Sequence, residues 1–487
     1  IVIEGGTNNT IKNNHITRNS WCGLDVHGSE KNCFEDNYIA NNSGDGISLA
    51  SSDLNVIQLN NITGNGNYGI FIETSTNNSI INNTIMNCGA NGITIIDSNN
   101  IFIRDNSIIK SCGDGIYLLT SDNNIIERNL MMDNTGNAVW IDGQHNMVQL
   151  NELCGNGKGI SLALSASNNT IARNNITDTL GDYGLFIPSY SNFNVVYKNK
   201  ILDSDASGIC IQGAYNNLTG NLVANNSEYG ILLSSANNTL RDNIMTSNKY
   251  NFGVHGGFIQ DIDASNTVDG KPIYYLVNCH NLTISDAGYV ALINCTGIIV
   301  EKLQLKNNMQ GVLLQWASNS TIRYCSISDN YYGLEAQDSS DIKVYNNNFI
   351  NNEFAVWIGH SSITWDNGYP SGGNYWSDYT STDNYSGPNQ DQSGGDGIWD
   401  NPYYHLFLEI NDTYPLAAPI QFYNAGTWNE KSRQIQVITR SDISNFQINT
   451  EERIISFNVT GEPGSVFCRI AVSYTHLRAH ETEADIV

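Results

Sequence analysis

A repeat of 23 residues is the feature that most limits what this chain can fold into. The doublets Gly69-Ile70, Gly92-Ile93 and Gly115-Ile116 recur at this interval. Asparagines follow the same period in a second column, which contains Asn14, Asn37, Asn60, Asn83, Asn106, Asn129, Asn151, Asn174, Asn199, Asn221 and Asn243. A period of this length is typical of a solenoid, in which each copy is one small unit that buries its apolar face against its neighbours.

The pattern inside each copy is that of β-strands. The triplets Ile70-Phe71-Ile72 and Ile93-Thr94-Ile95 alternate with period two, and β-branched residues dominate. No copy holds an apolar set at helical spacing, and the consensus of leucine-rich repeats is absent. Each copy therefore predicts two or three short strands between Gly, Asn and Ser corners. Stacked copies predict an all-β fold, a parallel β-helix with turns of about 22–25 residues.

The asparagine columns are predicted to be structural. A corner leaves backbone N–H and C=O groups without partners, and such groups are costly when buried. An Asn amide both donates and accepts, so that Asn60, Asn83 and Asn106, one turn apart, can form a hydrogen-bonded ladder. We therefore expect these residues to hold the corners and not to bind ligands.

The period divides the chain into segments. Rungs run to about residue 250, fail up to about 278, and resume with Gly311-Val312 and Gly333-Leu334. The composition then shifts to Trp, Tyr, Gly and Asp. We expect a β-helix at 1–250, an insertion at 251–278, a continued β-helix at 279–360, an aromatic and Asp-rich capping module at 361–416, a truncated β-sandwich-like domain at 417–470, and a tail at 471–487.

That tail fits nothing before it. Residues Ser473 to Thr482 resemble a translated sequencing adaptor, so we treat the tail as an artefact and exclude His476 and His480 from functional arguments. The chain also begins with Ile1 inside a strand-like run, which predicts that its natural N-terminus lies elsewhere.

Charge and composition exclude several classes of function. The formal net charge is −25, which argues against binding to nucleic acid or to anionic lipid. No apolar run is long enough to span a membrane. The ten Cys residues form no C-x-x-C motif, so neither a zinc ribbon nor a redox dithiol is indicated. Asn-x-Ser/Thr sites such as Asn61-Ile62-Thr63 favour an extracellular location.

Three features together resemble a known family. They are the Asn and Gly-Ile rungs, the segment from Asn266 to Tyr275, and the module from Gly373 to Tyr379. They are similar to archaeal cell-surface proteins with NosD-like right-handed parallel β-helices. The resemblance implies a right-handed helix and a cell-surface or secreted location. It also implies carbohydrate binding or cleavage or, in one branch, maturation of a copper site.

A column of outward aromatic residues predicts a sugar-binding strip. The middle residue of each Ile-x-Ile triplet points away from the core, because side chains alternate along a strand. At successive turns this column reads Phe71, Thr94, Tyr117, Trp140, Ser161 and Phe186. Exposed aromatic rings on a flat sheet suit stacking on sugar rings. We therefore assign carbohydrate binding to Phe71, Tyr117, Trp140 and Phe186, unless the insertion covers them.

Catalytic candidates are few. The motifs of pectin hydrolases are absent, and Val139-Trp140-Ile141-Asp142 only partly matches a pectate-lyase motif, because Gly143 replaces its His. Asp25 and His27 lie two residues apart, which places them on one face of a strand where they could act as acid and base. Asp25, His27 and Asp142 are therefore the catalytic candidates.

The capping module contains an Asp-rich loop. Asp391, Asp396 and Asp400 surround Gly394, Gly395 and Gly397, a composition that resembles loops that wrap Ca²⁺. The loop departs from a complete calcium motif, since Gln392 and Gly394 occupy two ligand positions. We predict a structural Ca²⁺ site on the three aspartates and no other cofactor.

The sequence favours a cell-surface or extracellular protein that is structural, adhesive or carbohydrate-binding, with a polysaccharide or cell-surface glycan as its partner. An alternative is a polysaccharide lyase, glycoside hydrolase or epimerase that uses the outward Asp and His residues. A third interpretation is a NosD-like copper-site maturation factor. Copper would need clustered Met, His or Cys ligands, whereas Met131 stands in the inward column and is predicted to be core.

Overall fold

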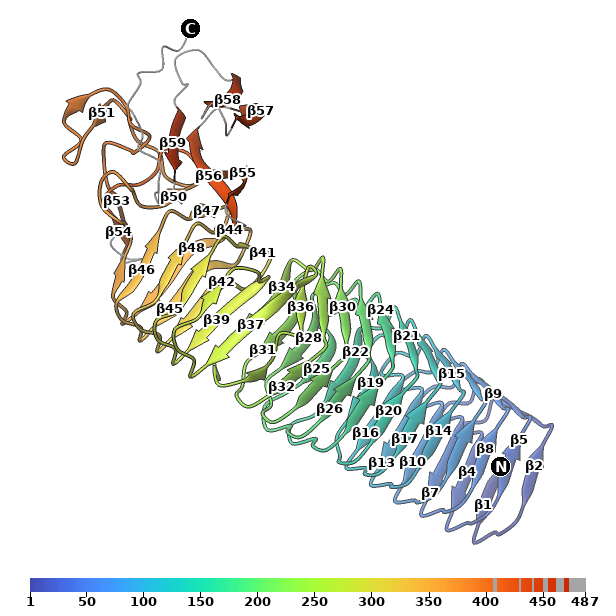
Figure 1. Ribbon diagram of the computed structural model, residues 1–487. Coiled ribbons are helices and arrows are strands. Elements are labelled where there is room, and N and C mark those ends of the chain that lie inside the picture. The colour runs from blue at the N-terminus through green and yellow to red at the C-terminus, as the bar shows by residue number, and fades with distance from the viewer. Residues whose placement is uncertain (406–409, 429–430, 440–441, 450–453, 461–467, 473–487) are drawn as a thin grey trace.

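The protein is a long rod of stacked turns, with a smaller C-terminal part at one end (Figure 1). The computed structural model describes residues 1–405, 410–428, 431–439, 442–449, 454–460 and 468–472. Strands, bends and turns make up these residues, with no α-helix among them. In that part of the chain, no helix is long and apolar enough to cross a membrane. The predicted all-β parallel solenoid is confirmed.

Residues 1–268 form the first solenoid, in which each turn contributes one strand to each of three parallel sheets. Sheet 2 runs from β2 (Thr10–Lys12) to β35 (Asp261–Ile262), and sheet 3 from β3 (His15–Thr17) to β36 (Thr267–Val268). The strands of sheet 1 are, in order, β1 (Val2–Glu4), β4 (Leu24–His27), β7 (Ile47–Ala50), β10 (Ile70–Glu73), β13 (Ile93–Ile96), β16 (Ile116–Leu119), β19 (Asn137–Ile141), β22 (Lys158–Leu162), β25 (Tyr183–Ile187), β28 (Ser207–Ile211), β31 (Tyr229–Leu233) and β34 (Tyr250–Val254).

The repeat sets the register of these sheets. Ile70 pairs with Ile93 and Ile93 with Ile116, so the Gly-Ile doublets of successive turns lie side by side. This column favours glycine, because a Cβ at Gly69 would stand 2.6 Å from the carbonyl oxygen of Gly92, although Ala138 occupies the position in one turn. The alternation within each strand therefore becomes an alternation between core and surface for the whole sheet.

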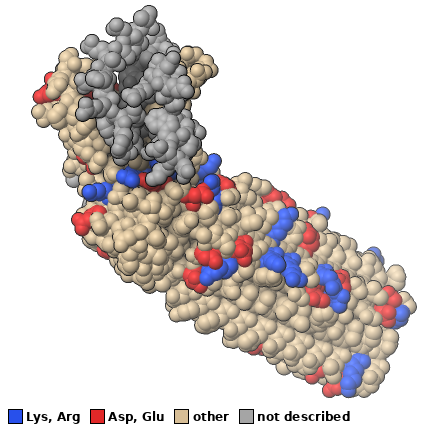
Figure 2. Space-filling view, in the orientation of Figure 1, with Lys and Arg blue, Asp and Glu red and all other residues tan. Residues whose placement is uncertain are grey.

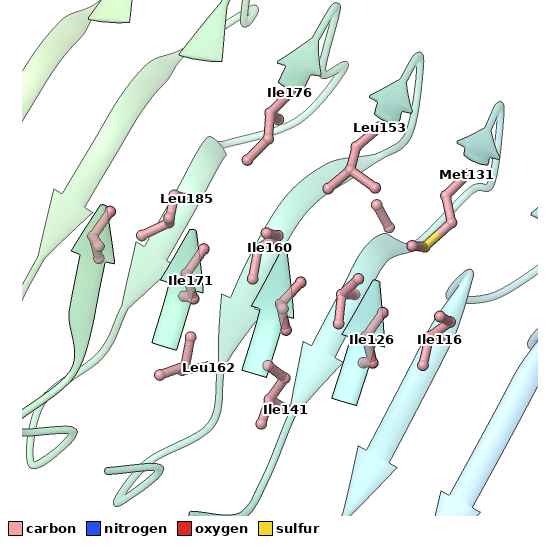
Figure 3. Close-up of a cluster of buried hydrophobic side chains, with 14 of the residues drawn as sticks. Ile116, Ile126, Met131, Ile141, Leu153, Ile160, Leu162, Ile171, Ile176 and Leu185 are labelled. Carbon is pink, nitrogen blue, oxygen red and sulfur yellow. The ribbon is translucent and has the colours of Figure 1, made fainter. Parts of the chain in front are cut away.

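The inward side chains form one continuous core. Ile70, Ile72 and Ile80 are fully buried, and so is Met131, as predicted. Figure 3 shows how residues from the three sheets converge on this core, among them Ile116, Ile126, Met131, Leu153 and Ile176. Stacked apolar columns of this kind give every turn the same environment as its neighbours, which explains why one short motif can be repeated without change.

The asparagine ladder is confirmed. The Nδ2 of Asn60 donates to Oδ1 of Asn83 over 3.0 Å, and the Nδ2 of Asn83 donates to Oδ1 of Asn106 over 3.0 Å. The amide of Asn83 also donates to the carbonyl oxygen of Ile57 over 2.9 Å. These side chains are buried, so the amides replace water as partners of the corner backbone.

The two solenoids are joined by a sheet with two buried faces. Strand β37 (Lys271–Val277) pairs antiparallel with β36 and begins sheet 4, which continues through β39 (Tyr289–Ile293), β42 (Gln310–Gln315), β45 (Tyr332–Gln337) and β48 (Phe354–Gly359). Tyr275, Ala291 and Leu313 of this sheet belong to the core of the first solenoid. Their neighbours Val290, Leu292 and Leu314 belong to the core of the second. Sheet 4 is therefore a wall shared by both cores.

This arrangement refines the expected insertion at 251–278. Residues 250–268 supply the last strand of each sheet of the first solenoid, and residues 271–277 supply the first strand of the shared wall. The period is interrupted here because the chain reverses at Asp269-Gly270, where both residues have positive φ.

The second solenoid has sheet 4 and two smaller parallel sheets. Sheet 5 contains β38 (Thr283–Ile284), β40 (Ile299–Glu301), β43 (Thr321–Arg323), β46 (Ile342–Tyr345) and β49 (Ile363–Thr364). Sheet 6 contains β41 (Gln304–Lys306), β44 (Ser326–Ser328), β47 (Asn348–Ile350) and β50 (Tyr375–Trp376). Trp365, Trp376 and Tyr403 pack onto the end of this core and cover it.

The remaining strands are short or antiparallel. Hairpins form between β51 (Tyr385–Ser386) and β52 (Gln392–Ser393), and between β53 (Tyr403–His405) and β54 (Ile410–Asp412). An antiparallel sheet contains β55 (Ile420–Trp428), β56 (Lys431–Thr439) and β59 (Cys468–Val472), and β57 (Asp442–Asn449) pairs with β58 (Ile454–Thr460). Most of the tail predicted to be an artefact, residues 473–487, lies outside the described residues.

Candidate functional site

The outward aromatic column is in register along sheet 1. Phe71 of β10 pairs with Thr94 of β13, and Thr94 pairs with Tyr117 of β16. The column continues through Trp140 of β19 and Ser161 of β22 to Phe186 of β25. All four predicted aromatic residues therefore lie in one straight row, which we call the aromatic strip.

The rings of the aromatic strip are ordered by stacking. Tyr117 and Trp140 stack between neighbouring turns, with ring centroids 4.4 Å apart and planes 6° from parallel. Phe71 stacks on Tyr68 at 5.5 Å, and Phe186 stacks on Tyr183 at 4.7 Å. All of these rings are half-buried. None is fully covered by other parts of the described chain.

Small residues separate the aromatic groups. Thr94 and Ser161, which occupy the intervening turns, are 1% and 6% exposed. The hydroxyl oxygen of Thr94 accepts a hydrogen bond from Nδ2 of Asn91 over 3.1 Å. The positions between the rings are therefore buried, and a ligand would contact the edges and the partly exposed faces of the rings.

Polar groups lie along one edge of the strip. The carboxylate of Asp114 accepts a hydrogen bond from Nδ2 of Asn137 over 2.9 Å, and burial raises the pKa of this carboxyl. Lys158 forms an ion pair with Asp182 at 2.7 Å. A shallow groove runs beside these residues, and its lining includes Asp133, Asn134, Thr135, Gly136, Asn137, Gly155, Gly157, Lys158, Leu180 and Gly181. Leu180 is 65% exposed and gives this groove an apolar side.

Charged groups elsewhere are mixed in sign. On the face shown in Figure 2, Lys and Arg lie close to Asp and Glu along the rod. Arg128, for example, lies 3.1 Å from Asp105 and 3.5 Å from Glu127.

The structure brings Asp25 and His27 together. Both lie on β4 with outward side chains, and Nε2 of His27 is 2.9 Å from Oδ1 of Asp25. His27 is exposed, whereas Asp25 is half-buried. Nearby, burial raises the pKa of the Asp45 carboxyl, which accepts a hydrogen bond from Nδ2 of Asn67 over 2.8 Å. An imidazole held by a carboxylate in this way has the geometry of an acid–base pair.

Asp142 does not join this pair. It follows β19 in the outward column that contains His27, but five turns further along sheet 1, which corresponds to about 24 Å at normal strand spacing. Asp142 instead lies beside the aromatic strip, close enough to contribute to the raised pKa of Tyr117, after burial and Asp114.

The three aspartates of the capping module have separate surroundings. The carboxylate of Asp400 accepts hydrogen bonds from the hydroxyl of Thr382 and from the N–H groups of Asn384 and Tyr385. Asp396 accepts one from the N–H of Ile398 at 3.0 Å, and Asp391 is exposed. No group of three or more His, Cys, Asp or Glu side chains arranged to hold a metal occurs among the described residues. The Ca²⁺ site stays a prediction.

Two rings beside the aromatic strip were not predicted from the sequence. Tyr68 and Tyr183 precede Phe71 and Phe186 by three residues, and each stacks on its partner. The common spacing Tyr-x-x-Phe is a signal that could have identified them. In contrast, the hydrogen bond that Nε2 of Gln310 donates to Oε2 of Glu335, between two strands of sheet 4, has no counterpart in the repeat.

Two family models match the chain. The right-handed β-helix region matches residues 1–129, 34–176 and 91–245, which together span half of the chain. The model of the periplasmic copper-binding protein NosD matches residues 208–381. No curated protein sequence matches the chain.

The copper implied by the second description can be tested against the side chains of that region. Copper favours clustered His, Met or Cys ligands. Met245 is fully buried in the core, and His360 lies 3.7 Å from Asp338 at an exposed corner. The part of the chain that the structure describes contains no metal-binding cluster of His, Cys, Asp and Glu. The thiols of Cys279 and Cys295 do lie close together in this region, with the N–H of Cys279 donating to Sγ of Cys295 over 3.4 Å, and copper binding stays a prediction.

Several solved structures are similar to this chain at low sequence identity. The A-module of the mannuronan C-5 epimerase AlgE6 from Azotobacter vinelandii is 14% identical, with a TM-score of 0.44 over 55% of this chain and 80% of that chain. A double mutant of the periplasmic alginate epimerase AlgG is 14% identical, with a TM-score of 0.42 over 64% and 81%. A tailspike protein of the E. coli bacteriophage HK620, in complex with a pentasaccharide, is 10% identical, with a TM-score of 0.33 over 64% of each chain.

Proposed function

Because the chain belongs to the right-handed β-helix family and carries a NosD-like region, we propose that it is a carbohydrate-binding protein that acts outside the cytoplasm. Its ligand is a polysaccharide or cell-surface glycan, and its role is adhesive or structural. The observation that carries this proposal is the aromatic strip, where Phe71, Tyr117, Trp140 and Phe186 stand in one outward row of sheet 1.

The fold does not require aromatic residues in this row. Thr94 and Ser161 occupy the same positions in intervening turns, and those turns have the same strands and register. Apolar ring surface that stays in contact with water is unfavourable and adds nothing to the core. The presence of these rings therefore favours a binding role. The apolar faces of sugar rings stack on such side chains, while their hydroxyl groups need polar partners. Asp114, Asn137 and Lys158 at the edge of the strip could provide these partners.

Replacement of one strip residue tests the proposal. A glycan array first identifies a bound oligosaccharide, and calorimetry then compares the protein with its Trp140→Ser variant. We expect the variant to keep its melting temperature within a few degrees and to bind more weakly by about 1–3 kcal/mol, the scale of one large contact.

Trp316→Ser is the matched control for this experiment. Trp316 is 45% exposed and lies at a corner of the second solenoid, so its loss should leave binding unchanged. Equal weakening by both substitutions, or unchanged binding by Trp140→Ser, would contradict a role for the strip.

The Asp25–His27 pair favours catalysis as a second candidate function. The contact of 2.9 Å suits proton transfer at a sugar carbon or at a glycosidic oxygen, as in a polysaccharide lyase, hydrolase or epimerase. Incubation with the bound glycan distinguishes these outcomes. Release of unsaturated or shortened products, or inversion of a sugar centre, that is lost in His27→Ala would support an enzyme, whereas intact glycan would support a binding protein.

A further inference from the structure

One face of the first solenoid carries no acidic residue over four turns. These turns contribute to sheet 2 the adjacent strands β20 (Met147–Gln149), β23 (Thr170–Ala172), β26 (Val195–Tyr197) and β29 (Asn217–Thr219). No Asp or Glu occurs in these strands or in their flanking corners, which are residues 145–151, 168–174, 192–199 and 214–221. The whole chain has 48 Asp and Glu residues against 23 Lys and Arg, so this face departs from the acidic character of the protein.

Two cationic side chains meet at one edge of this face. Arg173 and Lys198 occupy the same corner in neighbouring turns, directly after strand positions that pair with each other, and both are exposed. Their charged groups lie 5.9 Å and 5.0 Å from the centre of the Tyr197 ring. The pKa of Tyr197 is lowered, chiefly by a hydrogen bond with Lys198 and also by one with Arg173. Both cations therefore lie close to the hydroxyl of this tyrosine.

Neither cation is paired with a carboxylate within the described part of the chain. The arginines near the same corner of other turns do have such partners: Arg104 and Arg128 pair with Asp105, and Arg241 pairs with Asp261. The positive charge of Arg173 and Lys198 is therefore available to an anion that approaches from solvent. A guanidinium can donate two parallel hydrogen bonds to such a group.

Apolar surface extends from the cations across the sheet. Val195, which precedes Tyr197 on the outward side of β26, is 36% exposed. At the other end of β26, Phe193 stacks on Tyr215 of the next turn, with ring centroids 5.3 Å apart and planes 15° from parallel. These two rings are 56% and 53% exposed. Contiguous apolar groups that stay exposed on a soluble surface mark a binding site.

The charge of this face is opposite to that of the face with the aromatic strip. Beside the strip, the carboxylates of Asp114 and Asp142 act on Tyr117, and Lys158 is already paired with Asp182. The face of sheet 2 instead offers exposed rings with two free cations. The two faces therefore suit ligands of different charge.

We propose that the face formed by Phe193, Val195, Tyr197 and Tyr215 with Arg173 and Lys198 is a second binding site, for an acidic glycan. The rings contact the apolar faces of sugar residues, and the two cations bind the carboxylate or sulfate groups of the chain. The site lies on a different sheet from the aromatic strip and does not depend on the strip being a glycan site.

Two oligosaccharides that differ only in charge test this site. Calorimetry at physiological salt compares a hexamer of galacturonic acid with the same hexamer fully methyl-esterified, which is uncharged. We expect the acid to bind about tenfold more tightly, an advantage that falls as the salt concentration rises. The double variant Arg173→Gln/Lys198→Gln should lower the affinity for the acid by about tenfold and leave the affinity for the ester unchanged.

A second double variant separates specific binding from a general effect of net charge. Arg18→Gln/Lys302→Gln makes the same change of charge at two other exposed corners, where the residues also have positive φ, as Arg173 and Lys198 do. It should bind the acid as the parent protein does. Phe193→Ser removes an exposed ring without changing the charge, and it should weaken the binding of both hexamers.

Four results would overturn the proposal: equal affinity for the two hexamers, equal loss in the two double variants, unchanged binding in Phe193→Ser, or binding of an acidic peptide, hexaglutamate, as tight as that of the acidic sugar. Trp140→Ser should leave the binding of the acid unchanged. Loss of this binding in Trp140→Ser would also overturn the second site, and it would place the acidic glycan on the aromatic strip.

Discussion

The two solenoids use the same right-handed turn but differ in how their corners and outer faces are built. In the first, one Asn column continues from turn to turn, as in the contacts of Asn83 with Asn60 and Asn106. In the second, the corners mix residue types, so that Cys325 stands above Asn347 and Ala317 above Ser339. The outer face of sheet 1 carries partly exposed rings such as Phe71 and Trp140, whereas the same face of sheet 4 is largely buried against the first solenoid.

This difference shows how a repeat acquires distinct surfaces. In the first solenoid the core and ladder are uniform, so the outward column is free to vary, and the aromatic strip occupies it. In the second, contact with another domain fixes the outward column, and polar groups such as Gln310 and Glu335 are retained where that contact ends. Four predictions test this comparison.

Leu313 and Leu314 are neighbours on β42 that face different cores, and their truncation should show the largest effects. Both are at most 1% exposed. Each change to Ala should reduce the free energy of unfolding by about 2–4 kcal/mol through lost burial and a cavity. Only Leu313→Ala weakens the contact between the solenoids, so calorimetric melting should separate into two transitions in that variant. A single transition in both variants would contradict the shared wall.

Asn83→Leu should have the next largest effect on stability. It removes the partner of Asn60 and leaves N–H and C=O groups in a buried corner without hydrogen bonds, which should cost about 2–3 kcal/mol. Asn352 ends the ladder of the second solenoid and is partly exposed, so Asn352→Leu should cost about 1 kcal/mol. Chemical denaturation measures both, and equal losses would show that continuity of the ladder is unimportant.

The cap of the second solenoid should respond to pH. Burial raises the pKa of Asp412 to about 7, against hydrogen bonds from the N–H of Asn374 and the indole N–H of Trp376. A carboxyl with a raised pKa in the folded state stabilises the protein at pH values below its unfolded pKa, and this stabilisation is lost as the pH rises through 7.

The free energy of unfolding of the parent protein should therefore be lower at pH 8 than at pH 4.5, by about 3 kcal/mol. Asp412→Asn, which cannot ionise, should remove most of this difference. Asp114→Asn is the control, because Asp114 of the first solenoid also has a raised pKa but is only half-buried, and it should leave most of the difference in place.

Lys158→Ala should have the smallest effect on stability. The ion pair with Asp182 is exposed, and pairs of this kind contribute about 0–1 kcal/mol, less at high salt. Thermal melting should therefore change little, whereas calorimetry with the identified glycan would reveal whether this edge of the strip contacts the ligand. A large loss of stability would mean that the pair is structural.

Most of the fold of the first solenoid was determined by the local sequence pattern. Alternation along each strand sends Ile70 inward and Phe71 outward, and the 23-residue period aligns these positions between turns. From these two facts follow the solenoid, the Asn ladder, the buried Met131, the aromatic row and the contact between Asp25 and His27, because each depends on residues that are neighbours in the strand or one turn away.

The junction was decided by tertiary structure. Gln310 meets Val254 across 56 residues of sequence, and neither position carries a repeat signal that predicts the contact. The alternating pattern of β42 places Leu313 and Leu314 on opposite faces of sheet 4. It does not predict that both faces are buried. That depends on the reversal of the chain at Asp269-Gly270, which places sheet 4 against the end of the first solenoid. A periodic sequence specifies which turn packs on which. Where the period breaks, the contact between the two solenoids depends on the shape and the apolar area of the surfaces that they would otherwise expose.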